Sequence, residues 1–463
     1  MRKIGLTLIC LLSAIAVYAE QTEVTVYNQD LGLIKDQRNI ELKKGLNKIE
    51  FTDVAAFIEP TSVHFVSLTD PSAANILEQN FEFDLVSSDK LLSKYIDKAI
   101  KLLSEDGRLY EGTLLSFDSA SVVIDTAEGL AIVERPQNVR QILMEKLPEG
   151  LITKPTLVWE IDNTKAAKHT VELSYLTRGM SWLCEYVTVL DKDDKSLDLN
   201  GWVSVDNRSG VTYNDAKFKL VAGDVRRAPE VPQAPRYREM MMASKAEGMQ
   251  QFQEQAFFEY HLYDLQRKTT LKNNQNKQIS LLNAAGVPVS KEFVFDPSVG
   301  GDSYRYYSDS EVLKENARVE IAFTNSKEAK LGMPLPKGKV KVYKKDDSGS
   351  LQFVGEDAIK HTPKDEKIRL YIGDAFDVVG ERKRVDFREE HHSITETYEI
   401  SLRNHKQGDI EVIVREKLWR YTNWNIEQSS VQGEKKDAST MEFKVIVPKD
   451  GEQKLVYTVK YWW

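Results

Sequence analysis

The chain has 463 residues, and its 63 Lys and Arg are outnumbered by 71 Asp and Glu, which gives a formal net charge of −8. Acidic and basic residues are interspersed, so the sequence offers no basic surface for nucleic acid, and we exclude that class of partner. The length is sufficient for roughly two to four domains with buried apolar cores.

Residues 1–19 have the pattern of a cleaved secretory signal peptide. Arg2 and Lys3 precede an apolar run that ends in a small residue at position 19. Lipid anchoring at Cys10 is disfavoured because the bulky Ile9 precedes it. Cleavage would take the net charge from −8 to −10. No later segment has the apolar length needed to cross a membrane as a helix.

Cleavage would leave Cys184 as the only cysteine, so the mature chain could not form an internal disulfide. An exported chain with so few cysteines is more typical of a bacterial envelope than of eukaryotic secretion. We therefore expect an exported protein of a Gram-negative bacterium that is periplasmic, associated with the outer membrane or extracellular.

The elements expected along the chain are almost all β-strands, because apolar and polar residues alternate with a period of two. Residues 20–85 contain hairpin patterns and form the predicted N-terminal β domain. Residues 86–148 begin with a short helix capped by "SSD", and five short strands follow. This order predicts a small barrel like those of SH3-like or Sm-like modules.

Long alternating strands return in residues 150–226 and predict the first part of a β-sandwich. Residues 227–256 are rich in proline and polar residues and are expected to form a flexible linker. The β pattern then continues through residues 257–463 and completes the sandwich domain. The expected fold class is all-β, with multi-domain antiparallel β-sandwiches and a small SH3- or Sm-like barrel inserted near the N-terminus.

Cys184 lies in "LTRGMSWLCEYVTVL", where it is either a nucleophile or a small apolar side chain within a strand. In a strand it shares one face with Trp182 and Tyr186. A nucleophilic thiol needs a base or a lowered pKa, and the nearest histidine in the sequence is His169. This pattern favours packing.

The segment "REEHHSITE" is the densest collection of metal-ligating residue types. On a regular strand His391 and His392 point to opposite faces, whereas Glu390, His392 and Glu396 could share one ion. A solvated strand face is the alternative interpretation. No cofactor-binding motif is present.

Aromatic residues concentrate in "LWRYTNWNIE" and in the final "VKYWW". Trp419, Tyr421 and Trp424 are the candidate binding surface, because exposed aromatic side chains bind glycans or peptides. The alternative is packing within the core or between domains.

Two segments, "SYLTRGMSWLCEYVTVL" and "LDLNGWVSVDNRSGVTYNDAKFKLVAGDV", carry a pattern of aromatic residues, glycines and an N-x-[ST]-G turn. The matching positions are Tyr175, Gly179, Trp182, Tyr186, Trp202, Asn207, Ser209, Gly210, Tyr213, Leu220 and Gly223. With "FEYHLYDLQRKTTLKNNQNKQISLL", this pattern resembles the conserved domain of unknown function of mucoidy-inhibitor-like proteins, over roughly residues 155–463. The resemblance implies an all-β architecture, and it implies no reaction and no catalytic residues.

The leading hypothesis is an exported, non-catalytic binding or structural β-sandwich protein of the bacterial envelope, with envelope proteins or glycans as partners. The alternative is a periplasmic hydrolase or metal-dependent enzyme that uses the cluster near His392. A transmembrane barrel is disfavoured, because strands such as "GKVKVYKK" are charged.

Overall fold

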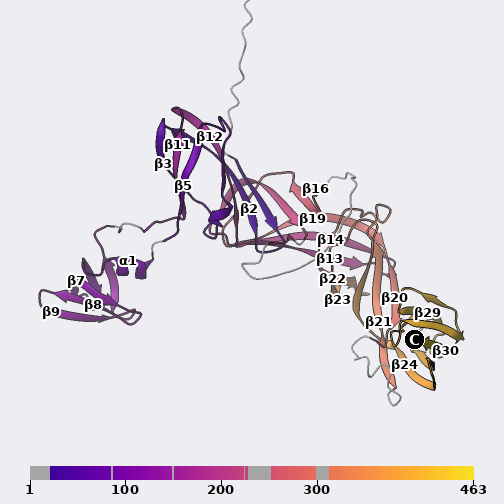
Figure 1. Ribbon diagram of the computed structural model, residues 1–463. Coiled ribbons are helices and arrows are strands. Elements are labelled where there is room, and N and C mark those ends of the chain that lie inside the picture. The colour runs from indigo at the N-terminus through magenta and orange to yellow at the C-terminus, as the bar shows by residue number, and fades with distance from the viewer. Residues whose placement is uncertain are drawn as a thin grey trace, which may run out of the picture. The chain divides into compact units, whose positions relative to one another are not determined.

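The computed structural model describes residues 21–84, 87–146, 148, 151–223, 225–227, 252–298 and 312–463. The predicted signal peptide and residues 228–251 of the predicted linker lie outside the described residues, whereas residues 252–256 of that linker belong to a strand, β16 (Phe252–Phe257). Within them the chain forms thirty strands, one α-helix and one short 3-10 helix (Figure 1). The predicted all-β class is therefore confirmed.

The chain divides into two compact units. The first unit comprises Met1–Ser181, Asp206–Lys219 and Lys268–Gln275. The second unit comprises Trp182–Val205, Leu220–Arg267 and Asn276–Trp463. Each unit is therefore assembled from segments that are distant in sequence.

Two sheets of the first unit share one core. One has the order β3 (Gly45–Thr52), β11 (Thr156–Asn163), β5 (Ala74–Glu82). The other is part of an eight-stranded sheet and has the order β15 (Tyr213–Ala222), β1 (Gln21–Tyr27), β2 (Gly32–Leu42), β12 (Ala167–Thr177), β4 (His64–Ser67), with β18 (Thr269–Leu271) paired to β15 and η1 (Pro60–Ser62) before β4. Trp159 of β11 packs against Phe51 of β3 and Phe65 of β4, each at 5.0 Å between ring centroids.

Strands of residues 20–85 pair with strands of residues 150–226. β11 lies between β3 and β5, and β12 pairs along its length with β2. The two predicted segments therefore contribute to the same sheets. Alternation of apolar and polar residues identifies each strand but does not identify the strand that it pairs with.

A small module forms a sheet of its own in the first unit. Its elements are α1 (Ser88–Lys94), β6 (Ala99–Ser104), β7 (Leu109–Phe117), β8 (Ser121–Thr126), β9 (Gly129–Glu134) and β10 (Val139–Leu143). The Ser87 hydroxyl accepts a hydrogen bond from the Lys90 amide at 3.3 Å and caps the helix. The strand order is β10-β6-β7-β8-β9, which places β9 and β10 at the two edges.

The second unit contains a hairpin and two larger sheets. The hairpin is formed by β16 (Phe252–Phe257) and β17 (Tyr260–Leu265). The five-stranded sheet has the order β19 (Gln275–Pro288), β14 (Ser196–Asn207), β13 (Met180–Leu190), β22 (Gly338–Lys345), β23 (Leu351–Ile359). The nine-stranded sheet has the order β27 (Asn423–Ser429), β30 (Gly451–Trp462), β25 (Ser393–Asn404), β24 (Lys367–Glu390), β21 (Leu313–Thr324), β20 (Ser290–Phe295), β26 (Ile410–Lys417), β29 (Thr440–Val447), β28 (Gly433–Lys435).

Two strand pairs of the second unit are parallel, whereas the sequence analysis predicts antiparallel sandwiches. β13 pairs with β22, and β20 pairs with β26. Parallel neighbours need a long connection between them, and both pairs join strands separated by more than a hundred residues. Such distant pairings leave no mark on local alternation.

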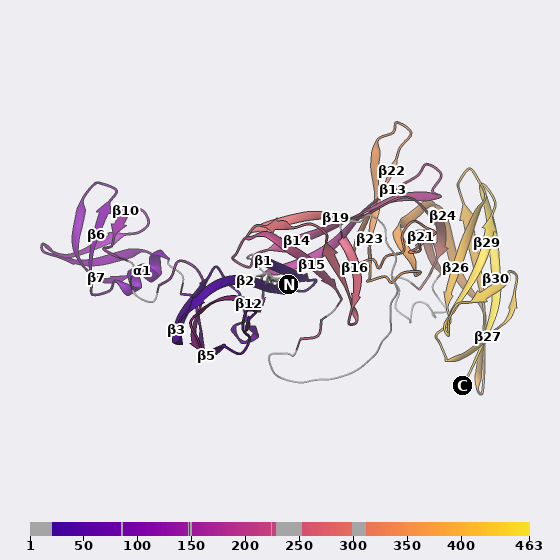
Figure 2. The ribbon, with the colours of Figure 1, turned by 90° about the horizontal axis from the view of Figure 1, so that it is seen from above.

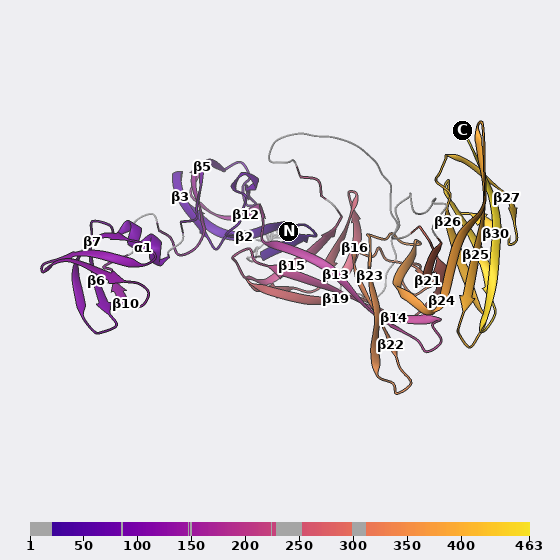
Figure 3. The same ribbon diagram turned by 90° about the horizontal axis from the view of Figure 1, so that it is seen from below.

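The nine-stranded sheet folds over its own core (Figures 2 and 3). Buried side chains of β25 and β30, such as Tyr398 and Tyr457, share this core with Phe443 of β29 and Val412 of β26. The neighbouring strands β25 and β30 are separated in the sheet from the neighbouring strands β26 and β29 by β24, β21 and β20, so the two ends of the sheet face each other as a sandwich. We call this part the C-terminal sandwich.

Four buried asparagines stand at or directly after the ends of strands. Asn163, Asn207 and Asn404 are the last residues of β11, β14 and β25, and Asn325 follows β21. Each is at most 1% exposed. Their side-chain amides are therefore shielded from water and need partners in the protein.

The side chains of all four strand-end asparagines form the same pattern of hydrogen bonds. Each side-chain amide donates to one carbonyl of the following turn and to two successive carbonyls of a distant segment. The distant pairs are Leu42 and Lys43 for Asn163, Leu271 and Lys272 for Asn207, Thr362 and Pro363 for Asn325, and Val447 and Pro448 for Asn404, at 2.9–3.5 Å. One side chain thus ties a strand end to a second segment.

Replacement of Asn404 with Asp keeps the size of the side chain and removes its donors. Three backbone carbonyls, of Gly408, Val447 and Pro448, would lose their donor and face a negative charge on a buried side chain. We expect Asn404→Asp to lower the free energy of unfolding by about 2–4 kcal/mol. Urea unfolding followed by tryptophan fluorescence measures the change.

The control is Asn425→Asp, because Asn425 is exposed on β27 of the same sandwich. Its effect is expected to stay within about 0.5 kcal/mol. Equal effects of the two substitutions would contradict the role of the strand-end asparagine.

Candidate functional site

Cys184 lies inside the second unit on β13. Its side chain is fully buried and points to the same side as the buried Trp182 and Tyr186. Burial raises the pKa of the Cys184 thiol to about 12, because an apolar surrounding disfavours the thiolate. The Tyr186 hydroxyl next to it donates to the Pro336 carbonyl at 2.8 Å. This environment suits packing and not nucleophilic attack.

The turn motif of residues 207–213 forms a buried network in the first unit. The Ser209 hydroxyl donates to the side-chain oxygen Oδ1 of Asn207 at 2.8 Å and lies 3.1 Å from the Tyr213 hydroxyl. Gly210 has a φ of +92°, and a Cβ there would lie 2.6 Å from the Cβ of Ala56. The N-x-[ST]-G pattern is therefore required by packing and by backbone conformation.

The candidate metal ligands are placed in two different surroundings. Glu390 and His392 are exposed at the tip of the β24–β25 hairpin, where Glu390 accepts a hydrogen bond from the Ser393 hydroxyl at 3.1 Å. The rings of His391 and His392 are 4.2 Å apart. Glu396 is fully buried on the inner face of β25.

Glu396 belongs to a buried ion network. Its carboxylate forms ion pairs with Arg384 and with Arg420, the latter at 3.0 Å. Nearby, Arg382 Nε lies 3.1 Å from both carboxylate oxygens of Glu416. Cationic partners already neutralise Glu396, so a metal ion would have to displace them.

No three His, Cys, Asp or Glu side chains are grouped closely enough to hold a metal ion within the part of the chain that the structure describes. The metal site around His392 thus stays a prediction from sequence. Period-two alternation indicates that Glu396 shares a face with Ile394 and Tyr398, but it does not identify the arginines opposite.

The three candidate aromatic residues also differ in exposure and packing. Trp424 is 8% exposed and belongs to the core, where its indole N–H donates to the Ala438 carbonyl at 2.7 Å. Trp419 is 46% exposed. Tyr421 packs on the edge of the core and stacks on Trp463, with 4.3 Å between ring centroids.

Two further aromatic side chains extend this surface. Trp463 is 49% exposed, and its backbone N–H donates to the His392 carbonyl at 3.3 Å. Trp462 is 42% exposed on β30, opposite Asn423 of β27 and Ser393 of β25. We call Trp419, Tyr421, Trp462 and Trp463 the terminal aromatic cluster; within it Tyr421 and Trp463 are in contact, whereas Trp462 points to the face of β30 opposite the buried Tyr461. The density of aromatic residues in "VKYWW" is the signal in the sequence that points to its last two members.

The loop that carries Trp419 and Tyr421 is anchored on both sides of Trp419. Leu418 is buried, and its N–H donates to the Ser439 carbonyl at 2.7 Å. Arg420 pairs with the buried Glu396. The buried ion network therefore fixes the position of the exposed aromatic rings.

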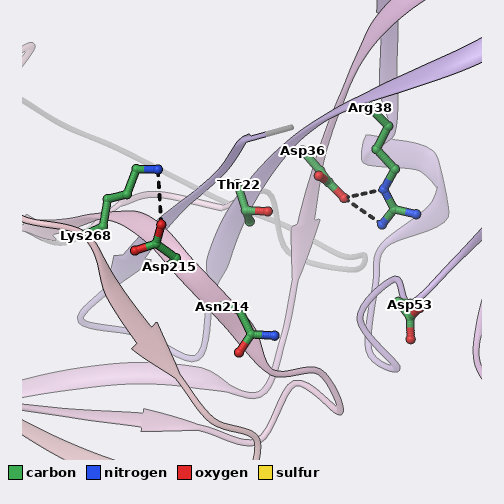
Figure 4. Close-up of a pocket in the computed structure, with 7 residues that line it drawn as sticks. All are labelled: Thr22, Asp36, Arg38, Asp53, Asn214, Asp215 and Lys268. Carbon is green, nitrogen blue, oxygen red and sulfur yellow. Dashed lines mark hydrogen bonds and ion pairs between the residues drawn. The ribbon is translucent and has the colours of Figure 1, made fainter. Parts of the chain in front are cut away.

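A polar pocket of about 500 Å³ lies in the first unit (Figure 4). Its lining residues are Thr22, Asp36, Arg38, Asp53, Asn214, Asp215 and Lys268. Arg38 binds the Asp36 carboxylate at 2.7 Å, and Lys268 lies 3.3 Å from that of Asp215. Ligand sites usually combine an apolar lining with a few polar groups, and this pocket has no apolar residue in its lining. The terminal aromatic cluster is the stronger candidate.

The Cys184 thiol is expected to be unreactive in the folded protein. Because its pKa is raised to about 12, the thiol stays protonated at pH 8 and the thiolate that reacts with disulfide reagents is absent. Labelling of residues 20–463 with a chromogenic aromatic disulfide should show almost no reaction in buffer and one thiol per chain in guanidinium. Rapid labelling of the native protein at pH 8 would revive the nucleophile hypothesis.

No helix in the described residues is long and apolar enough to span a membrane.

No curated protein matches the sequence. The model of one protein family, described as a domain of unknown function (DUF4139), matches residues 171–463. This match covers more than half of the chain and includes the C-terminal sandwich with its aromatic cluster. The chain therefore belongs to the DUF4139 family.

Proposed function

We propose that this protein is exported to the envelope of a Gram-negative bacterium and acts there as a non-catalytic binding protein. The pattern of residues 1–19 and the resemblance to mucoidy-inhibitor-like proteins support the location. The observation that carries the binding role is the terminal aromatic cluster, in which Trp419, Trp462 and Trp463 are each more than 40% exposed.

The cluster is organised before any ligand binds. Tyr421 and Trp463 are already stacked, with ring planes 20° apart, and Tyr421 lies 6.5 Å from the buried Tyr461. Trp419 sits between two anchored residues. A surface that is ordered in the free protein loses little conformational entropy on binding.

The proposed ligand is an envelope glycan. Sugar rings have apolar C–H faces that pack on flat aromatic rings and hydroxyl edges that need polar neighbours. The cluster supplies both, since the exposed His391, His392 and Asn423 lie beside its tryptophans. A folded peptide ligand would need a larger continuous apolar surface.

Binding of the mature chain to an array of bacterial envelope glycans tests the proposal. Trp419→Ala and Tyr421→Ala are expected to weaken binding to any positive glycan by about 30-fold, as buried aromatic contacts at binding sites do when truncated. Titration with the selected oligosaccharide, followed by calorimetry, measures the change.

Trp202→Ala is the matched control, because Trp202 is 40% exposed on β14, outside the cluster. It should leave the affinity unchanged. Absence of glycan binding by the wild-type chain, or equal losses in all three variants, would refute the proposal.

A further inference from the structure

The small module of residues 86–148 has two unpaired edges in one sheet. β9 pairs with β8 and β10 pairs with β6, and these are the first and last strands in the order β10-β6-β7-β8-β9. Strand edges present free N–H and C=O groups, and proteins usually cover or charge them.

The β9 edge is unusually apolar on its outer face. Leu130 is 69% and Ile132 is 71% exposed, and both point away from the module's core. The inward side of the same strand is filled by Val133, which is buried in that core. The outer side chains therefore contribute nothing to the packing of the module, and exposed apolar side chains along a strand edge mark a contact surface.

The β10 edge also carries an exposed apolar side chain, and its charge is opposite to that of the β9 edge. Leu143 is 47% exposed on the outer face, whereas Ile142 packs inward against the core. Each edge strand has a single charged side chain, and the two have opposite signs: Glu134 on β9 and Arg140 on β10. Both of these side chains are exposed.

We propose that the module binds a second copy of this chain, with β9 of one copy pairing with β10 of the next. An antiparallel register with Leu130 opposite Leu143 of the partner subunit keeps outward residues together on one face. It also places Ala131 opposite Ile142 of the partner subunit on the inner face. Backbone hydrogen bonds then continue the sheet from one copy into the next.

The contact is head to tail, because two different edges meet. After the first contact one copy keeps a free β10 and the other a free β9, so the same pairing can repeat into a ring or a row. In the proposed register Glu134 lies one position from Arg140 of the partner subunit, and the opposite charges of these two exposed side chains favour the pairing.

Cysteine cross-linking on the mature chain tests the pairing directly. A mixture of Leu130→Cys and Leu143→Cys chains should form a covalent dimer under mild oxidation, because directly opposed residues bring their Cβ atoms within disulfide range. Neither variant alone should dimerise. Leu109→Cys, on the central strand β7 and 50% exposed, is the matched control and should not cross-link with either variant.

The native Cys184 does not interfere with this experiment, because it is buried. A dimer of Leu130→Cys alone would show β9 pairing with itself and would overturn the head-to-tail contact. Absence of any dimer in the mixture at high micromolar concentration would overturn the proposal entirely, and another protein would then be the partner of these edges.

Charge reversal gives an independent readout by light scattering of the mature chain. Glu134→Arg and Arg140→Glu should each weaken self-association about tenfold, and the double reversal should restore it. A wild-type chain that remains a single-chain species, or a double variant as weak as the single ones, would contradict the contact. Neither residue belongs to the terminal aromatic cluster, so glycan binding tests a separate proposal.

Discussion

The hydrogen bonds of the strand-end asparagines are the constraint on which the architecture most depends. Each side-chain amide reaches two successive carbonyls of a distant segment, as Asn404 does with Val447 and Pro448. A buried side-chain amide that lost these acceptors would remain desolvated and unpaired. Each strand end is therefore stable only beside the segment that supplies the two carbonyls. The same hydrogen-bond pattern occurs in both units, so strand ends in both units are fixed in the same way.

Much of the fold follows from alternation of apolar and polar residues, and the strands of the small module illustrate this. Partners are harder to predict: nothing in "TLVWEIDN" shows that β11 inserts between β3 and β5. The four asparagines share no fixed spacing, so a search for regular repeats does not find them. The site was only partly predictable, because period two places Glu396 on an inner face but the neutralising arginines come from other segments.

Burial separates the structural residues from those that can act on a ligand. Cys184, Trp424 and Glu396 have chemically versatile side chains, yet each is enclosed and serves packing or charge neutralisation. The exposed aromatic rings beside them depend on that enclosed framework, since Arg420 joins Glu396 to the loop of Trp419. The small module has the reverse arrangement, with a complete inner core and apolar side chains left on its open edge.

Hydrogen exchange at the turns that follow the strand-end asparagines tests the central constraint most directly. In the turn after Asn207 the amides of Arg208, Ser209 and Gly210 are all bonded, to Gly179, Asn207 and Asn273. Mass spectrometry should find the amide of the buried Ser209 as well protected as the flanking strands, whereas the hairpin turn at residues 346–349, which is bonded but exposed, exchanges more quickly. Equal, rapid exchange in both turns would contradict the view that buried asparagines fix the strand ends.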